Sequence, residues 1–292
     1  MNQNSPSRGL DHLVIGVADL DAAGAFYESL GFRVGARNRH PWGTENRIVQ
    51  FPGAFLELIT VGDGTAIPPH GPRHFSFGAF VRDALARGEG MSMLVLESTD
   101  SRADAEGFRR AGIGDFEPFF FERQAQRPDG SQVRVAFSLA FAENAAAPDC
   151  GFFLCQQHEP QNFWNPAFQQ HGNGTTGLAA VFMLAAEPAA QREFLSAYAG
   201  APAVVTAEGG LRLDLPRGRI EVLTSGAAGA AFGDEGPGRA APSFAGFAVT
   251  VPDLARVDAL LARHAIRNLR QSGRIVVPAS AALGCAILFE QG

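Results

Sequence analysis

An imidazole and a carboxylate stand out within the apolar, strand-like segments of this 292-residue chain. His12 lies in LDHLVIG, where residues 12, 14 and 16 share one face of a strand because side chains alternate between faces. Glu57 lies in AFLELITV, on one face with Phe55 and Ile59. Such donors bind a divalent metal ion when a neighbouring segment adds further ligands, so we predict a metal site at His12 and Glu57. The alternative is a metal-free cavity in which His12 is hydrogen-bonded and Glu57 is paired or protonated, since an unpartnered buried carboxylate is costly.

A second group of functional side chains lies in the segment RHPWGTENR, residues 39–47. The segment is expected to be a loop, and loops held by a rigid sheet are where ligand contacts concentrate. Trp42 would stack on a substrate, while Asn46 and Arg47 would bind a carboxylate or carbonyl oxygen. The alternative is an ordered loop in which Arg47 pairs with Glu45.

Four copies of one pattern are expected to position these groups. The segment HLVIGVADLDAAGAFYESLGF (12–32) aligns without gaps with residues 93–113, 180–200 and 246–266, and further strand signals follow each copy. In the first copy, apolar residues at helical spacing predict a helix over Leu20–Leu30, with Asp19 or Asp21 as its N-cap. Each copy is therefore a βαβββ unit, and two units side by side would make a cup-shaped sheet with its helices outside.

The predicted fold class is α+β, with four βαβββ units forming two cup-shaped domains. The expected division is residues 1–175, with units 9–62 and 90–157, and residues 176–292, with units 177–225 and 243–291.

The second copy has Met93 where the first has His12, so another residue of that unit must supply the missing ligand. In its closing segment, CGFFLCQQH, residues 152, 154, 156 and 158 share one face of a strand. His158, or alternatively Gln156, would complete the metal site.

The polar stretch that follows contains His171, directly before a Gly-Asn-Gly turn. His171 would close the cup over a substrate; the alternative is a linker pinned by Trp164 against the second domain. In the third and fourth copies, Ala180 and Gly246 stand where the first has His12, so the second domain is expected to lack the site.

Composition excludes several classes of function. The net charge is -6, with 24 basic and 30 acidic side chains, which argues against a nucleic-acid binder that neutralises phosphates. No apolar run reaches the length needed to cross a bilayer, and no secretory signal is visible. Three cysteines without a CxxC pair favour a reducing compartment, so we predict a cytoplasmic protein. A homodimer is possible, and the second domain would then form its interface or complete a core.

The segments DHLVIGVADLDAAGAFYESLGF, RHPWGTENRIVQFPGAFLELI, FFLCQQHEP and NFWNPAFQQHGNG resemble the vicinal oxygen chelate superfamily, which has the glyoxalase/bleomycin-resistance fold, and within it the glyoxalase-like domain proteins. The resemblance covers residues 9–175. It implies metal ligands on the first and last strands of a unit, which are the positions of His12 and Glu57.

The resemblance leads to a functional hypothesis: a metal-dependent lyase or isomerase acting on a small oxygen-rich substrate by enolate stabilisation. Glu57 or His40 would transfer the proton. A ring-cleaving extradiol dioxygenase is disfavoured, because that class keeps a pair of histidines in its second half. The alternative function is metal-free binding or sequestration of a small molecule, of the bleomycin-resistance type.

Overall fold

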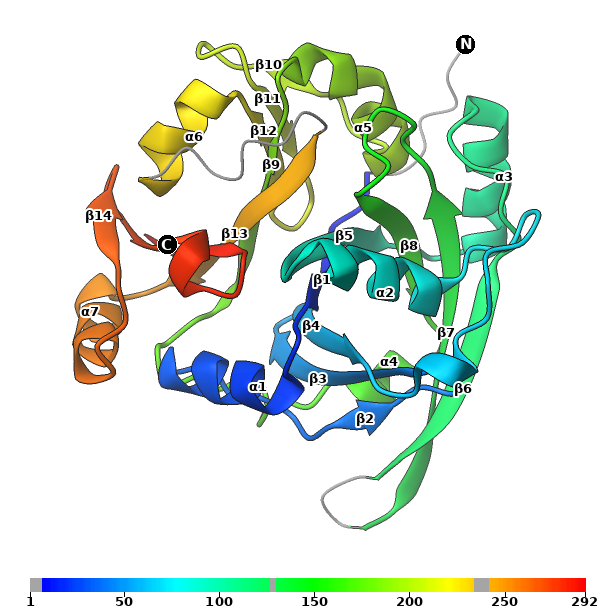
Figure 1. Cartoon of the computed structure of the whole chain (residues 1–292), viewed down its shortest axis with the longest axis horizontal. Helices are drawn as coiled ribbons and strands as arrows, with labels where there is room; N and C mark the ends of the chain where they lie inside the picture. Colours follow the sequence, from blue (N-terminus) through cyan, green and yellow to red (C-terminus); the bar gives the residue numbers. More distant parts are fainter. Residues whose placement is uncertain (1–6, 127–129, 234–241) are drawn as a thin grey trace.

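A computed structural model describes residues 7–126, 130–233 and 242–292 of the chain (Figure 1). Its first half runs β1 (Leu10–Gly16), α1 (Leu20–Ser29), β2 (Asn38–Arg39), β3 (Thr44–Phe51), β4 (Ala54–Val61), η1 (Gly64–Ala66), α2 (Phe77–Arg87), β5 (Gly90–Glu97), α3 (Ser101–Ala111), β6 (Phe119–Gln126), β7 (Gln132–Ala142), β8 (Gly151–Gln157) and α4 (Pro160–Phe163).

The second half repeats the order of strands and helices. It runs β9 (Gly177–Leu184), η2 (Pro188–Gln191), α5 (Arg192–Ala199), β10 (Val204–Val205), β11 (Leu211–Asp214), β12 (Arg219–Leu223), α6 (Ser225–Phe232), β13 (Ser243–Val251), α7 (Leu254–Arg263), β14 (Leu269–Gln271), β15 (Arg274–Val277), η3 (Ala279–Ala281) and β16 (Ala286–Gln291).

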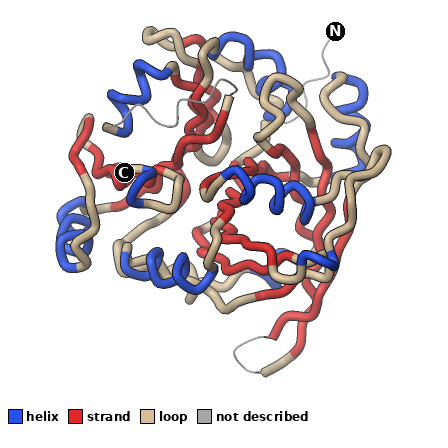
Figure 2. Tube along the Cα trace, viewed as in Figure 1, coloured by secondary structure: helices blue, strands red, loops and turns tan. Residues whose placement is uncertain are grey.

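The strands form two eight-stranded sheets with the same topology, which confirms the predicted α+β fold of four βαβββ units. The orders are β2-β3-β4-β1-β5-β8-β7-β6 and β10-β11-β12-β9-β13-β16-β15-β14. In each sheet the first strands of the two units pair antiparallel at the centre, and each of them pairs parallel with the last strand of its own unit. Figure 2 shows the strands gathered in two groups with helices around them.

The helix α1 illustrates how local sequence builds a unit. The Asp19 carboxylate accepts hydrogen bonds from the backbone N–H groups of Asp21 and Ala22, at 2.9 and 3.0 Å, and so satisfies two donors at the start of the helix. The helix ends at Ser29, one residue before the predicted end, and it buries Leu20 against the sheet. Asp19 is thus the N-cap, rather than Asp21.

The two sheets pack back to back through one continuous apolar core. That core contains Leu13 and Leu94 from the first sheet and Val181 and Phe247 from the second, together with the buried faces of α1, α3, α5 and α7. Tyr198 of α5 is fully buried there, and its hydroxyl contacts the carbonyl oxygens of Leu94 and Phe153 at 2.7 and 2.8 Å. Because the two halves share this core, the expected domain division at residue 175 stays a prediction.

The concave faces of the two sheets differ in what fills them. The first cup has its own apolar cluster, which includes Val14, Met93 and Phe153. In the second cup the helix α6 inserts Phe232, whose ring lies 5.4 Å from that of Phe182. A helix therefore occupies the space that remains available in the first cup.

The second cup also carries an ion-pair cluster in place of a histidine. Glu221 pairs with Phe182 in the register of β12 and β9, as Glu57 pairs with Val14 in the first unit. The Arg219 guanidinium binds Glu221 at 2.5 Å and Glu290 at 2.9 Å. In the second cup, the cation beside Glu221 is therefore the side chain of Arg219.

The described residues contain no helix that is both long and apolar enough to cross a membrane. Cys150, Cys155 and Cys285 are all buried.

Candidate active site

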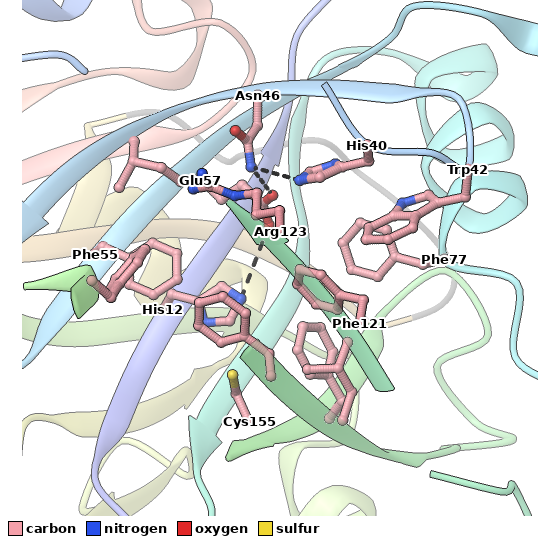
Figure 3. A pocket seen from close by; sticks show the side chains of 15 residues that line it. His12, His40, Trp42, Asn46, Phe55, Glu57, Phe77, Phe121, Arg123 and Cys155 are labelled. Atoms are coloured by element: carbon pink, nitrogen blue, oxygen red, sulfur yellow. Dashed lines mark hydrogen bonds and ion pairs between the residues drawn. The ribbon is translucent and has the colours of Figure 1, made fainter. Parts of the chain in front are cut away.

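A small cavity of about 60 Å³ lies inside the first cup (Figure 3). Polar groups from β1, β3, β4 and β6 meet there against an aromatic wall. The lining residues are His12, His40, Trp42, Asn46, Ile48, Phe55, Glu57, Phe77, Phe121, Arg123, Phe137, Leu139, Phe153, Cys155 and Phe163.

His12 is held in one orientation by its neighbour along the strand. Its Nδ1–H donates to the Asp11 carboxylate at 2.5 Å, and the other oxygen of that carboxylate accepts from Gln157 Nε2 at 2.9 Å. The imidazole also stacks on Phe55, with the ring centroids 4.2 Å apart. With Nδ1 protonated, Nε2 of the neutral ring is left with a free lone pair on the side of Glu57.

Glu57 is 6 % exposed and is held by an amide from the neighbouring strand. Asn46 Nδ2 donates to Glu57 Oε1 at 2.5 Å, while Glu57 Oε2 lies 4.0 Å from His12 Nε2. Metal bonds to histidine nitrogen and carboxylate oxygen are each about 2.0–2.2 Å, so one ion can contact both atoms. A carboxylate on Nδ1 is also the usual partner of a metal-binding histidine. One imidazole and one carboxylate therefore fit a divalent ion.

The second unit adds no equivalent donors to this pair. The strand pairing places Phe153 opposite Val95 as Glu57 lies opposite Val14, and Met93 holds the place of His12. The remaining coordination positions would fall to water or to substrate oxygens. A different donor group, Asp11, His12 and Cys155, has ligand atoms within 4.8 Å of one another, but burial raises the pKa of the Cys155 thiol well above its usual value.

The hairpin that follows β2 contributes His40 and Trp42 to the cavity. Gly43 has a φ of +86°, and a side chain there would collide with the backbone oxygen of Asp63, so only glycine fits this turn. His40 Nδ1 is hydrogen-bonded to Thr44 Oγ1 at 2.8 Å, and its ring stacks on Trp42 at 4.6 Å. Burial lowers the pKa of His40, opposed by the charge of Glu57, so the ring is neutral near pH 7.

Asn46 connects these groups. Its Nδ2 lies 3.3 Å from His40 Nε2 and donates to Glu57, and its Oδ1 accepts from Asn38 Nδ2 at 3.0 Å. The result is a continuous polar chain from Gln157 through Asp11, His12 and Glu57 to His40, embedded in aromatic side chains. Such an arrangement can bind an oxygen-bearing ligand and hold or move a proton.

The family model for the glyoxalase-like domain matches residues 10–199, about two thirds of the chain. The chain belongs to the glyoxalase-like domain family. This confirms the resemblance to the vicinal oxygen chelate superfamily, and it places the cavity within the matched region. No curated protein sequence matches the chain.

Solved structures resemble this glyoxalase-like protein in fold. A hypothetical protein from Staphylococcus aureus is 11% identical over 98% of this chain and 100% of its own, with a TM-score of 0.65. A mutant of 4-hydroxymandelate synthase from Streptomyces coelicolor is 14% identical over 98% of this chain and 93% of its own, with a TM-score of 0.61. The 2,2',3-trihydroxybiphenyl 1,2-dioxygenase from Sphingomonas wittichii is 14% identical over 98% and 91%, with a TM-score of 0.52.

In this glyoxalase-like protein the predicted loop at residues 39–47 is largely a hairpin, with β3 beginning at Thr44. Alternation along β3 puts Asn46 in the cup and Arg47 on the opposite face. Arg47 there binds the Asp21 carboxylate at 2.5 Å and the carbonyl oxygen of Gly35 at 3.2 Å. Arg47 therefore lies outside the cavity, and its partner is Asp21 rather than Glu45.

His158 does not reach the cavity either. In β8 the residues that face the cup are Phe153 and Cys155, so the set that includes Leu154 and Gln156 faces the opposite way. His158 is exposed beyond the end of that strand and is hydrogen-bonded to Ser138 at 2.7 Å. Neither His158 nor Gln156 lies at the cavity, because the face of β8 that lines the cup carries Phe153 and Cys155.

His171 is a buried structural residue. Its Nδ1 accepts from the backbone N–H of Arg33 at 3.0 Å, and its Nε2–H donates to the carbonyl oxygen of Gln50 at 2.8 Å. Its ring packs against Phe32 and Phe51. His171 thus ties the segment after β8 to the first unit, and it is absent from the cavity lining.

Three residues of the site could not be recognised from the sequence pattern: Arg123, Asp11 and Phe121. Arg123 and Phe121 come from β6, an edge strand whose alternation gives no sign of which face is concave. Asp11 precedes His12, and strict alternation would place it on the other face; a register shift between Leu10 and His12 lets both side chains meet.

Proposed function

We propose that this cavity is the active site of a glyoxalase-type enzyme, a lyase or isomerase that acts on a small oxygen-rich substrate. The observation that carries the proposal is an imidazole oriented by Asp11, with its free Nε2 4.0 Å from the carboxylate of Glu57, inside an apolar cup. Buried ionisable groups that converge on a concave site are the usual mark of catalysis.

His12 Nε2 and the Glu57 carboxylate would hold a divalent metal ion. When bound, such an ion polarises substrate oxygens and stabilises the negative charge of an enolate. Asn46 fixes Glu57 so that one oxygen faces His12. His40, kept neutral by burial, would accept a proton at Nε2, and the stacked ring of Trp42 holds the His40 imidazole in place.

A metal-free binding or sequestration protein is the second candidate. It is favoured by Met93 and Phe153, the apolar residues at the second unit's two ligand positions, since they leave only two donors from the protein. In this alternative Glu57 would be stabilised by its hydrogen bond from Asn46 and by the charge of Arg123.

Metal titration of tag-free protein separates the two. Mn²⁺ and Zn²⁺ are titrated by calorimetry into wild type, His12→Ala, Glu57→Gln and, as a control, His158→Ala. We expect one equivalent of metal in wild type and His158→Ala, and at least about tenfold weaker binding in the two cavity variants. Equal metal binding by all four proteins, or none by wild type, would refute the metal site and favour the binding protein. The cytoplasmic location and a homodimer stay predictions from the sequence.

A further inference from the structure

The guanidinium group of Arg123 is a cation on the cavity wall with no assigned partner. Within the described parts of the chain, the Arg123 side chain makes no hydrogen bond and no ion pair within 4.0 Å, although it is half-buried. Burial lowers its pKa, and the charge of Glu57 opposes that shift. Figure 3 shows the Arg123 side chain beside Glu57.

Other arginines near the cup are paired, which sets Arg123 apart. Arg134 on the neighbouring strand β7 binds Glu122 at 2.6 Å and Glu159 at 2.5 Å. Arg39, on the β2 edge, binds Glu45 at 2.9 Å. Taking a charge out of water without a partner is costly, so a half-buried unpaired guanidinium indicates a place for an anionic group.

The opposite wall of the cavity is aromatic. Trp42 packs edge-to-face against Phe121 at 4.9 Å and against Phe77 at 6.2 Å, and Phe121 stacks on Phe137 at 5.1 Å. The indole nitrogen of Trp42 is buried and has no hydrogen-bond partner within the described residues. Buried polar groups are normally satisfied, so an acceptor atom on a ligand would complete this donor.

We propose that the site takes a small aromatic carboxylate that has a second oxygen next to the carboxylate, and that Arg123 is the residue that selects for the acid. This inference rests on the proposed function, because it assigns the substrate class of the same cavity. The planar Arg123 fork would bind the carboxylate through two parallel hydrogen bonds. The ring would pack against Trp42, Phe77 and Phe121, and the adjacent oxygen would face His12 and Glu57.

Charge and the position of Arg123 support this class of ligand. Glu57 is an anion whose charge acts on Arg123, and it would repel the carboxylate of a ligand. His40 is neutral and would not offset this repulsion. Arg123 is therefore the cation that would compensate the charge of the ligand. The enclosed cavity of about 60 Å³ is smaller than such a ligand, so part of the ligand would extend beyond it. Arg123, Ile48 and Phe163 also line a wider groove outside, so the cation stands where the cavity opens.

The test compares a matched pair of probes, benzoylformate and its uncharged methyl ester, by calorimetry in the presence of EDTA. Pyruvate, which has the oxygens without the ring, is the third probe. We expect wild type to bind the acid at least about tenfold more tightly than the ester, and pyruvate more weakly than benzoylformate. Arg123→Gln should abolish the preference for the acid, while Arg123→Lys should keep part of it. Arg47→Gln, a matched control on the opposite face of β3, should behave as wild type.

Equal affinity for acid and ester in wild type, a preference that survives Arg123→Gln, or no binding of either aromatic probe would each overturn the proposal. Binding of pyruvate as tight as that of benzoylformate would overturn its aromatic part. Circular dichroism and thermal unfolding establish that each variant is folded. Because metal is absent from this assay, loss of the acid preference is distinct from failure of the metal site, which the titration of Mn²⁺ and Zn²⁺ alone reports.

Discussion

The Asp11→Asn substitution tests whether the site depends on the orientation of one imidazole. In wild type the Asp11 carboxylate can only accept, so in the neutral imidazole of His12 the proton is on Nδ1 and Nε2 has a free lone pair. An asparagine amide can instead donate to Nδ1, which moves the proton to Nε2 and removes the lone pair that would bind a metal ion. The side chains of both residues are at most 5% exposed, so water cannot readily replace the lost carboxylate.

The magnitude follows from the role of such outer partners. Removing the hydrogen-bond acceptor of a metal-binding histidine typically weakens metal affinity by about 10–100-fold, which is about 1.4–2.7 kcal/mol. The substitution changes no volume and keeps an amide within reach of Gln157, so the first cup should remain folded.

Two measurements make the result decisive. Calorimetric titration of Mn²⁺ and Zn²⁺ gives the change in affinity, and long-range ¹H–¹⁵N spectra of the histidine side chains report which nitrogen of His12 is protonated. Asp19→Asn serves as the control, because asparagine caps a helix as well as aspartate does and Asp19 lies outside the cup. Wild-type metal affinity in folded Asp11→Asn, or an unchanged tautomer, would show that Asp11 does not set the state of His12.

Three further predictions concern other residues of the first half of the chain. Arg47→Ala should leave metal affinity unchanged and shift the urea midpoint little, because its partner Asp21 is 65% exposed. A loss of metal binding would show that Arg47 contributes to the site. His171→Ala should destabilise the protein by about 2 kcal/mol or more in urea unfolding, since it removes two hydrogen bonds and leaves the carbonyl of Gln50 unpaired, while metal affinity in the folded protein stays the same. Burial lowers the pKa of both His40 and His171 below the usual 6.5, so the unfolded chain binds more protons than the folded protein just below that pH. The free energy of unfolding in urea should therefore be highest above pH 6.5 and should fall as the pH decreases through the folded pKa values. His40→Gln should make this fall shallower.

The α+β architecture was predictable because each unit is specified by its own local sequence pattern and that pattern is repeated. Four copies of a strand followed by a helix, each with further strands, indicate paired βαβββ units whatever lies around them. Asp19 caps its helix through backbone contacts two and three residues away, so the start of α1 follows from neighbouring sequence. Helix α6 shows the limit of local signals, because its Gly- and Ala-rich sequence forms a helix that buries Phe232 in the second cup.

The sequence by itself also identified His12, Glu57, Asn46, His40 and Trp42, which all line the cavity. These residues belong to one continuous unit, where the type of side chain and its place on a strand give enough information. Only the tertiary structure determined what the second unit contributes. Its closing strand is apolar on both faces, so no alternation in the sequence marks which face is concave, and a shift of one residue exchanges Cys155 for Gln156. Arg123 reaches the site because β6 and β2 are the two edges of one curved sheet, and the curvature of a sheet arises from the packing of all its strands rather than from any single one.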